Sequence, residues 1–360
     1  MPRPLRSGRY IRSCYPMQVK HLDLKKGVVD RARWDTFVTA CPEATFFHRA
    51  GWKEIIEDAL GHTCYFLYAE HNGEVQGVLP LGHVRSRLFG NALTSMPFCV
   101  YGGIAAMNQD ARRVLDEAAQ RLALELKVDY LEMRNLKPQH TDWPTKDLYV
   151  TFRKEIDADP EKNMLAIPRK QRAMVRKGIK AGLISEIDEN VERFYEAYAT
   201  SVYCLGTPVN SIHFYKKIKQ VFGAECEILT ITKDGRAISS VMSFYFRDEV
   251  LPYYGGGTNE AREFAANDFM YWELMRRAAE RGIRIFDFGR SKKGTGSYSF
   301  KEHWGFSPQP LYYEHYLLGI NEMPEINPLN PKYRLFIRAW KAMPYTLTKI
   351  IGPMVAKNIG

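Results

Sequence analysis

The stretch that decides the fold is residues 250–288, VLPYYGGGTNEAREFAANDFMYWELMRRAAERGIRIFDF. Apolar and aromatic residues from Val250 to Tyr254 predict a buried strand that ends in three glycines. The segment from Asn267 to Arg281 predicts a helix that ends at Gly282. Residues Ile283 to Phe288 predict a second buried strand. A crossover helix between two strands places them parallel in one sheet, so the stretch indicates an α/β fold.

The same order of elements occurs earlier in the chain. A predicted strand from Met96 to Ile104 contains two glycines near its end and precedes a predicted helix, Ala111 to Leu126, and a strand, Tyr130 to Arg134. A shift of about 155 residues superposes this segment on the later one, which indicates an internal duplication. Each half is also predicted to begin with two helices and an antiparallel meander. We therefore predict tandem α/β (α+β) domains, each a mixed sheet flanked by helices, in the order of elements of the GNAT acyltransferase fold.

These patterns predict five segments. They are a basic, disordered extension at residues 1–16, a first GNAT-like domain at 17–160, a basic interdomain helix at 161–183, a second GNAT-like domain at 184–320, and a basic amphipathic tail at 321–360.

Composition excludes several classes of protein. With 45% apolar residues among 360, the chain is long enough to bury a large core and is not disordered as a whole. It has no apolar run long enough to cross a bilayer. The cysteines lack disulfide-type or metal-ligand spacing, so we expect reduced thiols in a cytoplasmic protein and no zinc site. They are Cys14, Cys41, Cys64, Cys99, Cys204 and Cys226.

The net charge of +10 is unevenly distributed. Residues 1–20, 163–185 and 332–357 contain Lys and Arg but no acidic residue, so the remainder of the chain is net acidic. This concentration of positive charge predicts contact with a nucleic acid, a phosphate-linked substrate or an anionic lipid.

A second cationic feature follows the last predicted strand. Residues 286–306 read FDFGRSKKGTGSYSFKEHWGF and combine cations, glycines and aromatic residues. Such a loop suits a carboxylate, a phosphate or a developing oxyanion. The alternative is a solvated basic loop that only connects two strands.

The interdomain segment 168–182, PRKQRAMVRKGIKAG, predicts a helix between Pro168 and Gly182. One stripe of this helix is expected to be cationic and to bind an anion, while Val175 and Ile179 pack on the protein. The cations are Arg169, Arg172, Arg176 and Lys180, flanked by Lys170 and Lys177. The alternative is a solvated linker helix.

The tail predicts a basic amphipathic helix. Arg334, Arg338 and Lys341 recur at helical spacing, opposite Phe336, Trp340 and Met343. Such a helix can lie on an anionic membrane surface, or it can pack on its own domain.

With these features in place, the chain resembles the Fem family of aminoacyltransferases, and most closely its FemAB-related branch associated with the PEP-CTERM/exosortase system. The resemblance covers about residues 19–318. It is carried by IPRKQRAMVRKGIKAGL, LPYYGGGTNEAREFAANDFMYWELMRRAAERG and FDFGRSKKGTGSYSFKEHWGF. It implies a cytoplasmic tandem-GNAT protein that transfers an acyl group to an amine. In the founding members this is an aminoacyl group carried by tRNA.

The resemblance also implies site residues. Phe300-Lys301 matches the family's Phe-Lys pair, whose lysine stabilises charge during acyl transfer. The arginines of the interdomain helix match the segment near which anionic substrate is held. Unlike the bridge-forming enzymes, this chain lacks a long helical arm in its second domain and has a basic tail.

Acyl transfer to an amine needs a base and a positive group near the developing oxyanion. Lys301, fixed by Phe300 and Trp304, suits the second role and would stabilise the oxyanion by about 3 kcal/mol. The alternative is that Lys301 is a surface lysine beside a structural pair of aromatic residues. For the base we consider Asp287, whose alternative role is to orient Arg290, together with His303 and Tyr254. The alternatives for these two are a structural histidine and a core aromatic residue. The expected substrate-binding residues are Arg169, Lys170, Arg172, Arg176, Arg290, Ser291, Lys292, Gly294, Gly296, Phe300 and Trp304.

The function predicted from these features is direct attack of an amine on an acyl donor. The acceptor would be an anionic, nucleotide- or lipid-phosphate-linked precursor of the cell envelope or of an exopolysaccharide. The donor would be aminoacyl-tRNA, or acyl-CoA with less support because the expected pyrophosphate loop is missing. The alternative is a non-catalytic GNAT-fold adaptor that binds RNA or an anionic membrane through its basic segments.

Overall fold

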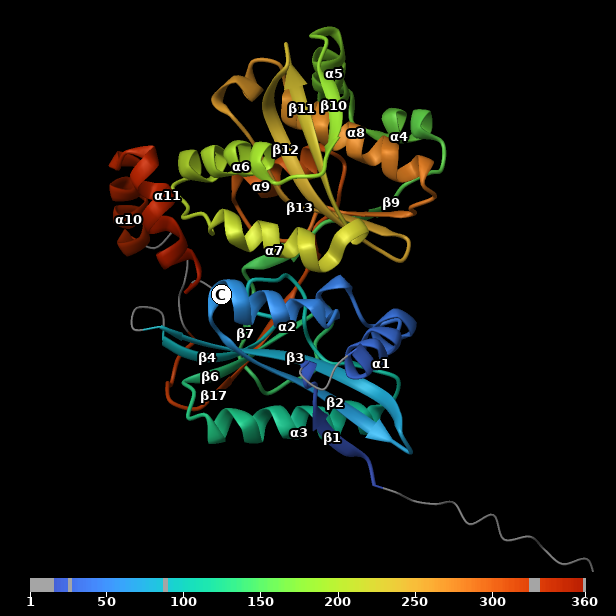
Figure 1. The fold of residues 1–360 in the computed structure, drawn as a ribbon, viewed down its shortest axis with the longest axis vertical. Coiled ribbons are helices and arrows are strands. Elements are labelled where there is room, and N and C mark those ends of the chain that lie inside the picture. Colours follow the sequence, from blue (N-terminus) through green and yellow to red (C-terminus); the bar gives the residue numbers. More distant parts are fainter. Residues whose placement is uncertain (1–15, 25–27, 87–89, 324–330, 359–360) are drawn as a thin grey trace, which may run out of the picture.

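The computed structural model describes residues 16–24, 28–86, 90–323 and 331–358, and it places the chain in two stacked α/β domains (Figure 1). The predicted extension at 1–16 lies almost wholly outside the described residues, as does Cys14. The five described cysteines are unpaired thiols.

The first domain is built on a mixed sheet. Its strands run in the order β1 (Gln18–His21), β2 (Thr63–His71), β3 (Glu74–Ser86), β4 (Gly90–Ser95), β6 (Tyr130–Asn135), β17 (Tyr312–Leu317) and β7 (Thr145–Lys146), with β5 (Ala105–Ala106) beside β3. Strands β4 and β6 are parallel and are joined by helix α3 (Gln109–Glu125). The remaining helices are α1 (Val28–Ala40), η2 (Phe46–His48), α2 (Gly51–Ile55) and its continuation η3 (Ile56–Leu60).

The second domain repeats this plan. Its sheet has the order β10 (Ile184–Asp188), β11 (Cys226–Lys233), β12 (Arg236–Phe246), β13 (Glu249–Gly257), β14 (Ile285–Asp287) and β9 (Arg153–Glu155). Strands β13 and β14 are parallel and are joined by α8 (Ala266–Glu280). The other helices are α4 (Pro160–Ala166), α5 (Arg169–Lys180), α6 (Glu192–Leu205), α7 (Ile212–Phe222), η4 (Gly223–Glu225) and η5 (Asn259–Arg262).

A small sheet and three helices complete the described chain. Strands β15 (Ser291–Lys292), β8 (Tyr149–Thr151) and β16 (Gln309–Pro310) form the small sheet. Helix α9 (Gly296–His303) follows β15, and α10 (Pro331–Ala342) and α11 (Tyr345–Ala356) lie at the flank of the molecule beside α6 (Figure 1).

The predicted duplication is confirmed, since β1, β2, β3, β4, β6 and β17 correspond in order to β10, β11, β12, β13, β14 and β9. In both sheets the sixth strand comes from the other half of the chain. Strand β17 follows the second domain in sequence but lies in the first sheet, and β9 precedes that domain but closes its sheet. The boundaries predicted at 160 and 320 therefore do not separate the two sheets.

The prediction of a strand from Met96 to Ile104 is wrong. Strand β4 ends at Ser95, and the chain then turns with φ of 50° at Met96 and 69° at Phe98, which extended backbone does not allow. The guanidinium of Arg134 donates to the carbonyls of Met96 (3.2 Å) and Cys99 (2.6 Å), groups that a strand would use for pairing. The true counterpart of β13 is β4.

The loop predicted at 286–306 is more ordered than its composition indicated. Pairing of β14 is limited to three residues, and the loop contains both β15 and α9. Gly289, Gly294 and Gly305 have φ between 67° and 79°, so the glycines turn the chain between these short elements.

The two domains share one aromatic core. The ring of Phe46 stacks on that of Phe244, with ring centres 4.5 Å apart, and the ring centres of Trp52 and Phe222 are 5.2 Å apart. Helices α2 and α7, which carry parts of this cluster, face each other between the sheets (Figure 1). The domains are therefore packed as one body, and the space between them has fixed walls.

The tail packs on its own domain, as one of the two predicted alternatives required. The Trp340 side chain is buried, Tyr203 donates to the carbonyl of Met343 at 2.9 Å, and Lys349 pairs with Glu196 at 2.5 Å. In the described part of the chain, no helix is both long and apolar enough to cross a membrane.

Candidate functional site

The carboxylate of Asp287 lies where the two domains meet. It ends β14 and is buried. Its Oδ1 accepts hydrogen bonds from the Gly289 amide (2.7 Å) and the Thr151 hydroxyl (3.1 Å). Its Oδ2 accepts one from the Tyr101 hydroxyl at 2.8 Å and lies 3.3 Å from Nε of Arg153. Asp287 is thus a fixed acceptor whose lone pairs are largely used.

Lys301 lies on the inner side of α9 and is only 8% exposed. Its Nζ donates to the carbonyls of Gly289 (2.9 Å) and Arg290 (3.1 Å) and lies 5.6 Å from the ring centre of Phe152. Burial lowers the pKa of Lys301 to about 7, against the opposing field of Asp287. The prediction of a lysine excluded from water agrees with this geometry.

The aromatic partners predicted for Lys301 have other roles. Trp304 is buried and donates to a carboxylate oxygen of Asp268 at 3.1 Å, while Phe300 packs near Tyr271, with ring centres 5.6 Å apart. The two residues fix the position of α9, and Phe152 forms the surface beneath the ammonium group.

Two of the predicted bases lie elsewhere. His303 is exposed and forms no hydrogen bond or ion pair within the described residues. Tyr254 lies in an aromatic cluster with Tyr198, Tyr215 and Tyr253, where burial raises its pKa well above the usual value of 10. Its surroundings are those of the core-aromatic alternative.

Arg290 and Lys292 form a cationic pair beside the aromatic ring of Tyr149. The Arg290 guanidinium lies 4.6 Å from the centre of this ring and donates to the Tyr313 hydroxyl at 3.1 Å, so Asp287 does not orient it. Burial and the charge of Arg290 lower the pKa of Lys292 to about 8. The neighbouring Ser291 hydroxyl is buried without a hydrogen-bond partner among the described groups. These side chains therefore offer donors for an anionic ligand.

The two predicted glycines of this loop differ. Gly294 has φ of 75° and makes the turn before α9, whereas an added Cβ at Gly296 would meet nothing within 4 Å. A side chain is excluded only at the first position, and there by the backbone conformation.

Sequence reasoning missed a cavity of about 430 Å³ between the domains. Tyr101, Arg153 and Glu249 line it on the side of Asp287, and Arg112, Arg134 and Lys137 line it on the side of the first domain. The volume lies within the range of small-molecule sites.

Glu249 is the titratable group that distinguishes this cavity. Its side chain is 17% exposed and pairs with the guanidinium of Arg153, which also contacts Asp287. Burial and the charge of Asp287 raise the pKa of Glu249 to about 8, although Arg153 acts in the opposite direction. An acid directly after a turn reads in sequence as a solvated residue, so no local signal identified Glu249.

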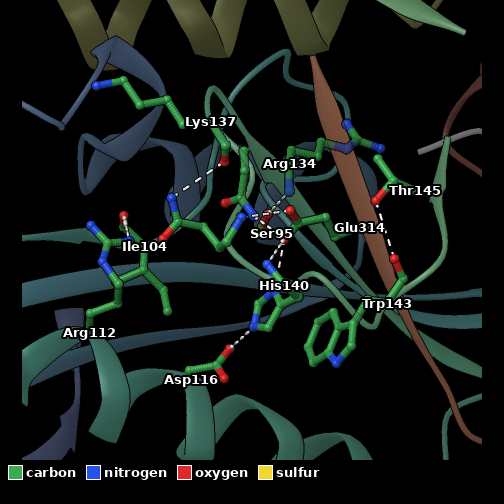
Figure 2. Close-up of polar contacts among 12 residues, drawn as sticks. Ser95, Ile104, Arg112, Asp116, Arg134, Lys137, His140, Trp143, Thr145 and Glu314 are labelled. Atoms are coloured by element: carbon green, nitrogen blue, oxygen red, sulfur yellow. Dashed lines mark hydrogen bonds and ion pairs between the residues drawn. The ribbon is translucent and has the colours of Figure 1, made fainter. Parts of the chain in front are cut away.

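A polar network supports the wall of the cavity in the first domain (Figure 2). His140 stacks on Trp143 and contacts Glu314 at 2.7 Å and Asp116 at 3.1 Å. Despite the opposing effect of burial, these two carboxylates raise the pKa of His140 to about 9. Because Glu314 belongs to β17, the network fixes the exchanged strand beside the cavity.

Helix α5 forms at the predicted position and has an open cationic face. Gln171 hydrogen-bonds to Asp268, and Val175 is buried against the domain, whereas Ile179 is half exposed, contrary to the prediction. The six predicted cations form no ion pair within the described part of the chain, and five of them line a shallow depression. The five are Arg169, Arg172, Arg176, Lys177 and Lys180.

Comparisons agree with this architecture. A model of the acetyltransferase (GNAT) domain family matches residues 167–302. The crystal structure of FemX is similar, with a TM-score of 0.64 at 16% identity, over 84% of this chain and 98% of that one. A tandem GNAT protein from the clavulanic acid biosynthesis pathway has a TM-score of 0.54 at 12% identity, over 85% and 100% of the two chains. The fold is thus that of a tandem-GNAT protein.

A sequence relative also indicates which tandem-GNAT proteins this chain resembles. A lipid II:glycine glycyltransferase of Staphylococcus epidermidis is 26% identical over 99 residues, which are 25% of this chain and 24% of the relative. Together with the fold and the domain match, this relative makes the chain similar to FemAB-like tandem-GNAT proteins. The chain matches only about a quarter of the length of this curated relative.

Proposed function

We propose that the protein is an acyltransferase that moves an aminoacyl or other acyl group onto an amine of a cell-envelope or exopolysaccharide precursor. The observation that carries this proposal is the buried Lys301 beside Asp287, within the region that matches the GNAT domain. The similarity to a lipid II:glycine glycyltransferase supports an acceptor that is linked to a lipid phosphate.

In the proposed reaction, the nitrogen lone pair of the acceptor attacks the acyl carbon of the donor. The carbonyl oxygen becomes negative, and the buried ammonium group of Lys301 donates a hydrogen bond to it. Collapse of this intermediate breaks the bond to the leaving group, which takes up the proton removed from the amine and departs as the ribose hydroxyl of tRNA or the thiol of coenzyme A. No covalent acyl-enzyme is required.

The amine must also lose a proton. The hydrogen bonds and ion pair of Asp287 occupy its carboxylate, so we assign to it the fixing of Arg153 and of the loop at Gly289. Glu249 faces the cavity and has a pKa of about 8, close to that of an effective general base near neutral pH. We therefore propose Glu249 as the proton acceptor and the interdomain cavity as the site of the amine.

The anionic parts of the substrates would lie on the two cationic surfaces. The open face of α5 suits the phosphates of a tRNA donor, and Arg290 with Lys292 suits a phosphate or carboxylate near Lys301. Acyl-CoA remains the other donor of this proposal. The proposed location is the cytoplasm, at the inner face of the membrane where a lipid-linked precursor is present.

The test is transfer by Lys301→Met with a panel of charged tRNAs and acyl-CoAs. We expect kcat to fall by about 100-fold or more with substrate affinity largely kept, because the lost donor acts on the oxyanion. Lys293→Met, which removes an exposed lysine of the same loop, is the matched control. Unchanged turnover in Lys301→Met would contradict the role of Lys301. Absence of transfer by the unmodified protein with every donor would favour the non-catalytic adaptor.

A further inference from the structure

The hairpin of α10 and α11, here called the C-terminal hairpin, is held in a fixed position. An added Cβ at Gly206 would lie 2.6 Å from Ile337, so the end of α6 touches α10 directly. Gly352 of α11 approaches the backbone of Val209 with similar closeness, its Cβ position lying 3.0 Å from the carbonyl oxygen. The contacts of Trp340 and Lys349 described above belong to the same inner face. The outer face of the hairpin therefore has a defined orientation on the molecule (Figure 1).

This outer face is apolar and exposed. On α11, Leu347, Ile350 and Met354 are 40%, 69% and 66% exposed, and their spacing of three and four residues places them in one stripe. On α10, Leu335 is 70% exposed, and Phe336 lies at the edge of this face, where it is 39% exposed and its ring stacks on that of Trp340. Single exposed apolar side chains are common, but five of the twelve large ones found among the described residues lie on this hairpin. We call these five side chains the outer apolar face.

The charge on the hairpin has one sign. Residues 331–360 contain no Asp or Glu. Arg338, Lys341 and Lys357 are exposed and form no ion pair within the described residues. Of these, Lys341 lies at the border with α6, since an added Cβ at Gly206 would be 3.1 Å from its Cε. Lys357 follows Met354 by three residues and so extends the stripe on α11 with a cation. An apolar face bordered by cations complements a surface that has apolar depth and negative charge.

We propose that the outer apolar face binds the surface of an anionic phospholipid membrane, with both helices lying in the plane of the interface. The five apolar side chains enter the region between headgroups and acyl chains, and the exposed cations contact lipid phosphates. A second copy of the chain fits less well, because two such faces in contact would bring cations together without an acid. This inference adds a partner to the proposed function and does not depend on it.

The experiment is co-sedimentation of the full chain with vesicles of phosphatidylcholine containing 30% phosphatidylglycerol, compared with pure phosphatidylcholine. We expect binding to the anionic vesicles that decreases with salt. The triple variant Leu347→Asp/Ile350→Asp/Met354→Asp should bind these vesicles at least tenfold more weakly. In Arg338→Ala/Lys341→Ala, the affinity for the vesicles should fall roughly fivefold or more for each cation removed. Leu124→Asp, an equally exposed apolar position on α3, should bind like the unmodified chain.

Thermal unfolding of each variant establishes that the fold is retained, and Ile350→Glu alone replaces the triple variant if that variant unfolds. Equal binding by the unmodified chain and by the folded variant would overturn the proposal. So would a dimer in solution that the triple variant dissociates, without vesicle binding by either protein. Because no acyl donor or acceptor is present, this result is independent of whether the protein catalyses transfer.

Discussion

The burial of Lys301 makes a prediction about stability that needs no substrate. In the unfolded chain this lysine titrates near its ordinary value of 10.5, and in the folded protein near 7. Between these values the unfolded state binds the proton and the folded state does not, so the free energy of unfolding rises with pH. Below pH 7 both states are protonated, and the whole cost of burying the charge is present.

The magnitude follows from the same shift. One pKa unit corresponds to about 1.4 kcal/mol, so Lys301 should contribute roughly 2 kcal/mol of added stability between pH 7.5 and 9.5. Lys301→Met removes this titration and leaves the carbonyls of Gly289 and Arg290 without their donor, a loss of about 1–3 kcal/mol at every pH.

The assay is urea unfolding at intervals from pH 6 to 9.5. The difference in free energy of unfolding between the unmodified chain and Lys301→Met should grow with pH by the stated amount, because all other titrating groups are shared. Lys293→Met should follow the unmodified chain, since that lysine is exposed. If the curves of the unmodified chain and Lys301→Met run parallel, the lysine is charged in the folded protein at all these pH values, and the reasoning from burial is wrong.

Two further predictions concern the proposed reaction. Glu249→Gln should lower kcat by about 100-fold, because the amide cannot accept the proton. Glu260→Gln, which removes a surface acid paired with Arg236, should keep the kcat of the unmodified chain. Arg172→Glu/Arg176→Glu should weaken binding of tRNA by tenfold or more and reduce its salt dependence, as filter binding would measure, whereas Arg113→Glu/Arg121→Glu on α3 should not. Unchanged affinity in the α5 variant would remove tRNA phosphates from that helix.

The sequence predicted those parts of the fold that rest on local pattern. The unit β13–α8–β14 and helix α5 show clear periodicity and terminal glycines, and both form where expected. The segment after β4 was misassigned because Arg134, which binds its carbonyls, comes more than thirty residues later. The exchanged strands were missed because their partners lie in the other half of the chain.

The candidate site shows the same division. Lys301 was found because a Phe-Lys pair is a contiguous motif. The cluster around Asp287 joins Tyr101, Thr151 and Arg153, which are 134 to 186 positions away in sequence, and neither spacing nor composition links them. The raised pKa of Glu249 arises only from its burial and from the charge of Asp287 in this assembly.

The exchange of β9 and β17 has a consequence for synthesis and folding. The strand of the first sheet that is synthesised last is β17, Tyr312–Leu317. That sheet therefore remains incomplete until nearly the whole second half has left the ribosome. Conversely, a separated second half would lack β9 and expose the edge of β14. Each half thus supplies one strand to the sheet of the other half, and we expect neither half to fold alone as a complete unit. Mixing them should restore a native form only if both exchanged strands are present, which makes their reassembly a sensitive measure of correct domain pairing.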